Sequence, residues 1–183
     1  MVVCDNLEDL GRRTAELFVT LATKAVTSHG RFSVALSGGE TPRALHSQLQ
    51  SDAYVARVPW SEVYVFWGDE RYVPHDHPDS NYGMARATML DQVPIPGENI
   101  FPVPTGKGDA ESAAGQYQET LRSFFNLDQG EQPQIDLIVL GMGEDGHTAS
   151  LFPDTAALEN SSEVVVANYL EKLDAHRVTL TIP

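Results

Sequence analysis

The residues best suited to chemistry follow a short glycine-rich turn. This turn runs from Gly141 to Gly146, and His147 follows it directly. A histidine can accept and release a proton near neutral pH, and a neighbouring carboxylate such as that of Asp145 can fix its tautomer and raise its basicity. The alternative is a hydrogen-bonded structural histidine, which the neighbouring Asp145 makes less favourable. The pattern therefore indicates a general base at His147 that Asp145 orients.

The same turn also matches the glycine spacing of a dinucleotide-binding loop. Glu144 and Asp145 would, however, place two negative charges where a pyrophosphate must bind. Pro153 also leaves little room for the long helix that such a loop opens. We therefore interpret the glycines as a tight turn that directs His147 into a crevice.

A second turn, with the sequence Ser-Gly-Gly-Glu-Thr-Pro at positions 37–42, follows a short apolar segment. Gly38 and Gly39 allow a ligand to approach the backbone, and the first N–H groups of a following helix favour an anion. The hydroxyls of Ser37 and Thr41 can add donors. No Gly-Lys-Ser/Thr follows, so the turn is not a Walker A loop. These residues alone fit a phosphate cradle and a simple helix cap about equally well.

A third turn carries three consecutive charges, Asp69, Glu70 and Arg71. The guanidinium of Arg71 can bind the oxygens of a substrate while a neighbouring carboxylate holds it in place. The alternative is a solvated loop with local ion pairs. Close by, His75 and His77 superficially resemble a metal site. No second His or Cys cluster completes a tetrahedral set, so we expect a polar loop there.

The apolar patterning predicts the elements that position these turns. Helical spacing predicts helices from Asn6 to Gly30, from Pro42 onward, from Asp79 to Asp91 and from Ala110 to Phe125. Apolar runs predict strands at 32–36, 63–67, 135–140, 164–167 and 178–182. Strands that alternate with helices indicate an α/β fold, here a Rossmann-like, doubly wound, mostly parallel sheet with helices on both faces. Ligands of such sheets bind beyond the carboxyl ends of the strands, so the three turns should converge on one crevice.

Composition narrows the class of protein further. The length of 183 residues suits one domain with a sizeable core. The formal net charge of -14 argues against a nucleic-acid partner, and means that an anionic substrate must be held by a few local donors. We expect no membrane partner, because no apolar run is long enough for a span. A single cysteine and no secretory signal favour the cytoplasm.

Together, the motifs resemble the 6-phosphogluconolactonase family. The resemblance rests on the turn at 37–42, on Trp-Gly-Asp-Glu-Arg-Tyr-Val-Pro at 67–74 with Ser-Asn-Tyr at 80–82, and on Gly-Met-Gly-Glu-Asp-Gly-His-Thr-Ala-Ser-Leu-Phe-Pro at 141–153. The related glucosamine-6-phosphate isomerases share the fold, but typically have a tyrosine in place of Arg71 and an asparagine in place of Asp145. Both differences favour the lactonase.

The resemblance implies an activity and a role for each site residue. The reaction is hydrolysis of 6-phospho-D-glucono-1,5-lactone to 6-phosphogluconate in the oxidative branch of the pentose phosphate pathway, without metal or cofactor. His147 would activate water against C1, Asp145 would orient His147, and Arg71, supported by Asp69 and Glu70, would stabilise the oxyanion. The phosphate would rest on the turn formed by Ser37, Gly38, Gly39 and Thr41, clamped by Lys172 and Arg177.

The resemblance to the family is weaker at the C-terminal end of the chain. Arg177 begins an Arg-Val-Thr-Leu-Thr segment that is similar to the family's later phosphate-binding strand, but a proline-rich segment usual before it is absent around Lys172. Family members usually continue past the position of Pro183. We therefore expect residues 1–183 to form a single sugar-phosphate-binding domain that lacks the family's C-terminal portion, as a monomer or small homo-oligomer. A glucosamine-6-phosphate isomerase or deaminase and a non-catalytic phosphosugar binder remain the alternatives.

Overall fold

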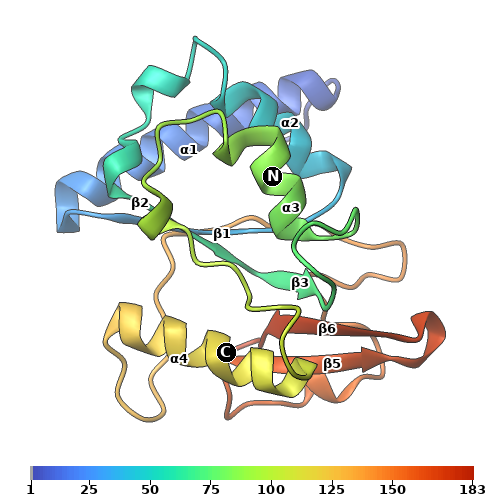
Figure 1. The fold of residues 1–183 in the computed structure, drawn as a ribbon. Coiled ribbons are helices and arrows are strands. Elements are labelled where there is room, and N and C mark those ends of the chain that lie inside the picture. Colours follow the sequence, from blue (N-terminus) through green and yellow to red (C-terminus); the bar gives the residue numbers. More distant parts are fainter. Residues whose placement is uncertain (1) are drawn as a thin grey trace.

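The computed structural model describes residues 2–183, which form two three-stranded sheets with helices packed around them (Figure 1). The parallel sheet has the order β2-β1-β4, with β1 at Phe32–Leu36, β2 at Val63–Trp67 and β4 at Leu137–Ile138. The antiparallel sheet has the order β3-β6-β5, with β3 at Asp69–Arg71, β5 at Val165–Leu170 and β6 at Ala175–Leu180.

The helices are α1 (Leu7–His29), α2 (Glu40–Leu49), α3 (Asn81–Ala85), which continues as a π-helical turn over Arg86–Leu90, and α4 (Ala110–Phe125). Short 3₁₀ turns lie at Val55–Arg57, Trp60–Glu62, Gly97–Asn99, Ala156–Leu158 and Glu171–Leu173.

Aromatic side chains cover the parallel sheet on both faces. On one face, Phe18 of α1 meets Phe32 of β1 edge to face, with 5.2 Å between the ring centroids. On the other face, Phe124 of α4 lies 5.0 Å from both Tyr64 and Phe66 of β2. Helices therefore pack against both faces, and the predicted α/β class is confirmed.

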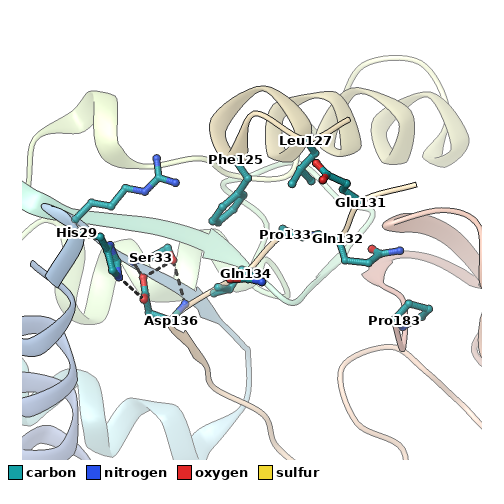
Figure 2. A pocket seen from close by; sticks show the side chains of 12 residues that line it. His29, Ser33, Phe125, Leu127, Glu131, Gln132, Pro133, Gln134, Asp136 and Pro183 are labelled. Carbon is teal, nitrogen blue, oxygen red and sulfur yellow. Dashed lines mark hydrogen bonds and ion pairs between the residues drawn. The ribbon is translucent and has the colours of Figure 1, made fainter. Parts of the chain in front are cut away.

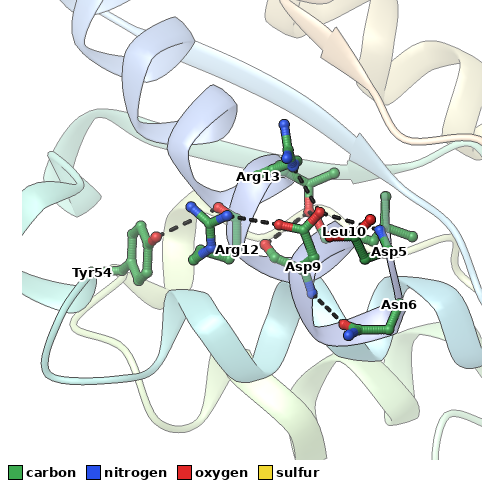
Figure 3. A network of polar contacts seen from close by, with 9 residues as sticks. Asp5, Asn6, Asp9, Leu10, Arg12, Arg13 and Tyr54 are labelled. Carbon is green, nitrogen blue, oxygen red and sulfur yellow. Dashed lines mark hydrogen bonds and ion pairs between the residues drawn. The ribbon is translucent and has the colours of Figure 1, made fainter. Parts of the chain in front are cut away.

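The first helix begins and ends where its capping residues predict. The Asn6 side chain accepts a hydrogen bond from the backbone N–H of Asp9 at 2.9 Å, and Gly30 closes the helix with a φ of 82°. Asp9 also binds the guanidinium groups of Arg12 and Arg13 at 2.7 and 2.8 Å (Figure 3). These contacts fix the start of the helix that covers β1.

The strand β4 is much shorter than the predicted segment 135–140, and a side-chain contact helps to hold it. One carboxylate oxygen of Asp136 accepts hydrogen bonds from the backbone N–H and the hydroxyl of Ser33, at 2.8 and 2.7 Å. The other oxygen lies 3.1 Å from Nε2 of His29 (Figure 2). Asp136 thus anchors the chain beside β1 just before the two paired residues of β4.

Two further details differ from the sequence-based expectation. The predicted strands at 164–167 and 178–182 lie in the second, antiparallel sheet as β5 and β6, and not in the mostly parallel sheet that was expected. Only a short turn joins them, whereas a parallel pair needs a crossover of about a dozen residues or more. In α2, Pro42 occupies the third helical position rather than the first, still within the turn whose N–H groups lack helical partners.

Candidate active site

The three predicted turns line one cavity of about 300 Å³. Its wall comes from the turn at 37–42, from Asp69 and Arg71 of β3, from Asn81 at the start of α3, and from the segment 141–149. Each of the three turns follows a strand, so the predicted convergence beyond the strand ends is confirmed. A larger hollow of about 960 Å³ lies near the start of β1 and β4, around His29 and Asp136 (Figure 2). None of the residues predicted to carry chemistry lines that hollow.

His147 reaches this cavity with one ring nitrogen already bonded. Its Nδ1 lies 2.5 Å from a carboxylate oxygen of Asp145, which also accepts the backbone N–H of His147 at 3.2 Å. The contact with His147 lowers the pKa of Asp145. Phe152 stacks on the imidazole, with 3.8 Å between the ring centroids. A carboxylate at Nδ1 places the ring proton there, so Nε2 is the nitrogen that can accept a proton from a ligand.

The glycines of this turn make room for the imidazole. A side chain at Gly143 would collide with the His147 ring, and the N–H of Gly143 donates to the carbonyl of His147 at 2.9 Å. Gly146, with a φ of 83°, donates to the carbonyl of Gly143 at 3.0 Å. No helix opens from the turn, since the next helical residues form the 3₁₀ turn Ala156–Leu158. The structure thus supports a histidine-directing turn rather than a dinucleotide loop.

The turn at 37–42 offers unpaired donors. Ser37 is 5% exposed, and its hydroxyl has no hydrogen-bond partner among residues 2–183. Gly39, with a φ of 99°, is the N-cap residue of α2, and no side chain caps the first N–H groups of this helix. A side chain at Gly38 would collide with the amide oxygen of Asn81. Backbone N–H groups at a helix start and a buried hydroxyl together suit an anionic oxygen.

The two acidic residues of the third turn have different surroundings. Asp69 lines the cavity and accepts a hydrogen bond from the Ser150 hydroxyl at 2.6 Å. Glu70 is fully buried and accepts the backbone N–H groups of Arg71, Asn81 and Tyr82 at 2.7–2.8 Å. Burial raises the pKa of both carboxyl groups. Glu70 therefore organises the start of α3, while Asp69 belongs to the cavity wall.

The expected hold of a carboxylate on the Arg71 guanidinium is wrong in detail. The guanidinium donates instead to the backbone carbonyl of Asp79 at 2.8 Å, and Glu70 contacts Arg71 through its backbone N–H. Glu70 accepts the backbone N–H groups of Asn81 and Tyr82, and this holds the neighbouring Asp79 carbonyl within reach of Arg71. Among the described residues, the Arg71 guanidinium therefore lines the cavity without a bonded carboxylate.

Arg177 and Lys172 are not placed alike. Arg177, half-buried on β6, pairs in register with Arg71 on β3, and burial together with the Arg71 charge lowers the pKa of Arg177. Lys172 is exposed in the 3₁₀ turn between β5 and β6. Neither residue lines the 300 Å³ cavity. The structure brings Arg177 next to a cavity residue and leaves Lys172 apart.

Two residues that the sequence analysis did not assign to the site also belong to it. Asn81 is 2% exposed, lines the cavity and donates from its amide to the backbone carbonyl of Asp69 at 2.9 Å. Ser150 is 1% exposed and binds the Asp69 carboxylate. Both stand inside the motifs that carry the family resemblance, at 80–82 and 141–153. Their position in these motifs could have assigned them to the site, since neither an asparagine nor a serine indicates a functional site by its chemistry alone.

The comparisons with known proteins agree with this geometry. A family model described as glucosamine-6-phosphate isomerases/6-phosphogluconolactonase matches residues 5–183. The 6-phosphogluconolactonase of Synechocystis sp. is 46% identical over 97% of this chain and 72% of its own length. That of Nostoc sp. is 44% identical over 93% of this chain and 69% of its own length. The solved structure of 6-phosphogluconolactonase from Trypanosoma brucei superposes with a TM-score of 0.86 at 28% identity, covering 98% of this chain and 75% of that one. The chain belongs to the glucosamine-6-phosphate isomerase/6-phosphogluconolactonase family.

Proposed function

We propose that this chain hydrolyses 6-phospho-D-glucono-1,5-lactone to 6-phospho-D-gluconate, a step of the oxidative branch of the pentose phosphate pathway. The observation that carries the proposal is the His147–Asp145 pair beside Arg71 in a cavity with unpaired anion donors. The names of the relatives support the same activity.

The chemistry divides between His147 and Arg71. Nε2 of His147 takes a proton from a water molecule as the water oxygen attacks C1 of the lactone. The negative charge that develops on the carbonyl oxygen is stabilised by Arg71. When the bond between C1 and the ring oxygen breaks, the histidinium returns its proton to that oxygen. Asp145 holds the Nδ1–H tautomer and stabilises the histidinium throughout.

The phosphate binds at the turn formed by Ser37, Gly38, Gly39 and Thr41. The unpaired Ser37 hydroxyl and the first N–H groups of α2 donate to its oxygens. Arg177 adds a positive charge from β6, and Lys172, which lies apart in the β5–β6 turn, would have to approach from that turn to contact the phosphate. The phosphate is bound and not transferred, so these steps use no metal and no cofactor.

Several coarser expectations accompany this activity. The partner is a small phosphorylated sugar lactone, and we propose that the protein works in the cytoplasm as a single domain, alone or as a small homo-oligomer. Among residues 2–183, no helix combines the length and the hydropathy that crossing a bilayer requires.

One assay separates the lactonase from its alternatives. Freshly prepared phosphogluconolactone and, separately, glucosamine 6-phosphate are supplied, while proton release and ammonia release are followed. We expect acid release from the lactone above its spontaneous rate, and no ammonia from the amino sugar. Ammonia release would identify an isomerase or deaminase. Binding of 6-phosphogluconate without turnover of either compound would identify a non-catalytic binder.

A further inference from the structure

Ser150 joins three parts of the structure that meet behind the cavity. It follows His147 by three residues and is 1% exposed. Its hydroxyl donates to the Asp69 carboxylate at 2.6 Å, and its backbone N–H donates to the Thr179 hydroxyl at 3.3 Å. Its carbonyl accepts the amide N–H of Asn168 at 2.9 Å. One residue thus ties the segment after His147 to β3, β6 and β5.

The backbone between His147 and Ser150 needs such an anchor. Ala149 lines the cavity with a φ of 49°, in the left-handed region that non-glycine residues rarely occupy. A strained conformation persists only where the surrounding structure holds it. On the N-terminal side, Thr148 donates from its hydroxyl to the carbonyl of Gly141 at 2.9 Å. On the C-terminal side, Ser150 supplies the hold with its three hydrogen bonds.

Asp69 depends on the same contact. Asp69 is 8% exposed, and its shortest side-chain hydrogen bond comes from the Ser150 hydroxyl, whereas the amide of Asn81 is 3.4 Å away. The charges that act on it come from Arg71 on its own strand, Arg177 on β6 and His147 on the turn. The orientation of the Asp69 carboxylate therefore affects the field at the histidine and at both arginines.

We propose that Ser150 is a positioning residue: its hydroxyl ties the segment after His147 to the Asp69 carboxylate, and this tie fixes both the carboxylate and the angle at which His147 enters the cavity. It acts through Asp69 and the Ala149 backbone, not by touching the substrate, since Ser150 does not line the cavity. The expected effect of Ser150 on turnover rests on the proposed lactonase function. Its effect on the position of His147 is independent of that function.

The chain contains a matched control for Ser150→Ala. Ser33 is also 1% exposed, and its hydroxyl donates to an aspartate carboxylate, that of Asp136, at 2.7 Å (Figure 2). It lies on the wall of the other hollow, away from the 300 Å³ cavity. Ser33→Ala therefore removes a buried serine–aspartate hydrogen bond of the same kind, together with the one that the Ser33 hydroxyl accepts from the Asp136 N–H at 3.1 Å, without touching the site. Ser150→Thr keeps the hydroxyl donor and serves as the conservative variant.

The kinetic test compares kcat and KM for phosphogluconolactone in the three variants. We expect Ser150→Ala to lower kcat about 10–100-fold, the scale of a misplaced catalytic group, with KM changed less than about twofold. Ser150→Thr should recover part of kcat, and Ser33→Ala should leave both constants unchanged although its melting temperature falls. A Ser150→Ala enzyme with wild-type kcat, or one in which KM alone rises, would overturn the proposal.

A second measurement keeps the placement of His147 testable without turnover. The ¹⁵N shifts of the His147 imidazole report which ring nitrogen carries the proton. We expect Ser150→Ala, but not Ser33→Ala, to change these shifts as the ring leaves its position against Asp145. Unchanged shifts in Ser150→Ala would overturn the positioning role. Changed shifts in a protein that does not hydrolyse the lactone would instead refute the proposed function alone.

Discussion

Arg71 and Arg177 stand directly opposite each other in the antiparallel pair of β3 and β6. Residues paired in this way project to the same face of a sheet, and like charges directly opposite are destabilising. The guanidinium of Arg71 donates to a backbone carbonyl, and that of Arg177 donates to the carbonyl of His176 at 3.1 Å. Carbonyl groups do not neutralise the two charges. The buried Asp69 carboxylate acts on both charges, and a bound anion would offset them further, which would allow a chain with a net charge of -14 to hold a phosphorylated substrate.

The first prediction concerns Arg177→Ala. A hydrogen bond to a charged group is worth about 1.5–3 kcal/mol, so we expect KM for the lactone to rise about 10–100-fold while kcat changes little. The melting temperature without ligand should not fall in proportion, because the variant also removes the repulsion from Arg71. Michaelis–Menten kinetics and thermal melts with and without inorganic phosphate measure both effects. An unchanged KM would remove Arg177 from the phosphate site.

Lys172→Ala provides the comparison, because this lysine is exposed in the β5–β6 turn and does not line the cavity. If the lysine helps to hold the phosphate, its loss should raise KM less than that of Arg177. Equal effects on KM would show that the turn approaches the cavity when substrate binds. No effect would confine the phosphate contacts to the 37–41 turn and Arg177.

The second prediction concerns His147→Ala. Loss of a general base typically costs about 10²–10⁴ in rate, so turnover should fall by that factor. Binding of 6-phosphogluconate, measured by calorimetry, should remain near the wild-type level, because the donors at 37–41 are untouched. His29→Ala, at the other hollow, serves as the control. Near-normal turnover of the His147 variant would refute its role as the base.

Local signals in the sequence were sufficient for the first helix and for the turns at 37–42 and 141–146, whereas the segment expected as a third turn forms the strand β3. Asn6 marks the start of α1 through its side-chain cap, Gly30 marks the end through its left-handed backbone, and the glycines before His147 mark a tight turn without any tertiary information. The long-range hydrogen bonds could not be predicted in this way. Ser150 binds a carboxylate 81 positions away, and the Arg71 guanidinium finds a carbonyl only because Glu70 folds the following loop back. Such partners depend on the packing of the two sheets.

The third prediction concerns His46 on α2, which is fully buried. Its Nδ1 lies 2.8 Å from the Thr88 hydroxyl, whereas its Nε2 has no partner among residues 2–183. Burial lowers the pKa of His46 to about 4, so the folded protein keeps the imidazole neutral. The unfolded chain, with an ordinary histidine pKa of about 6.5, binds the proton more readily. Stability linked to His46 is therefore complete above about pH 6.5 and is lost as the pH falls toward 4.

The shift of the His46 pKa corresponds to roughly 3 kcal/mol across this pH range. Urea unfolding at pH 7.5 and at pH 5 should show a smaller loss of unfolding free energy in His46→Gln than in the wild type. His77→Gln, which changes an exposed histidine, should retain the wild-type dependence. Parallel curves for the wild type and His46→Gln would show that burial of His46 does not contribute to acid sensitivity.

The fourth prediction concerns Gly143→Ala, compared with Gly115→Ala. A methyl group at position 143 would collide with the His147 ring, whereas one at position 115 of α4 meets nothing within 4 Å. We expect Gly143→Ala to lower kcat about 100-fold, because the imidazole must move away from Asp145 and from the attacking water. Gly115→Ala should instead raise the unfolding free energy by up to about 1 kcal/mol, with normal kinetics, because alanine is favoured over glycine inside a helix. Equal kcat in the two variants would show that the imidazole can shift within the turn without losing its catalytic position. Gly143 has no functional group of its own. A loss of turnover in Gly143→Ala would therefore show that the glycine at this position is needed to make room for the His147 ring.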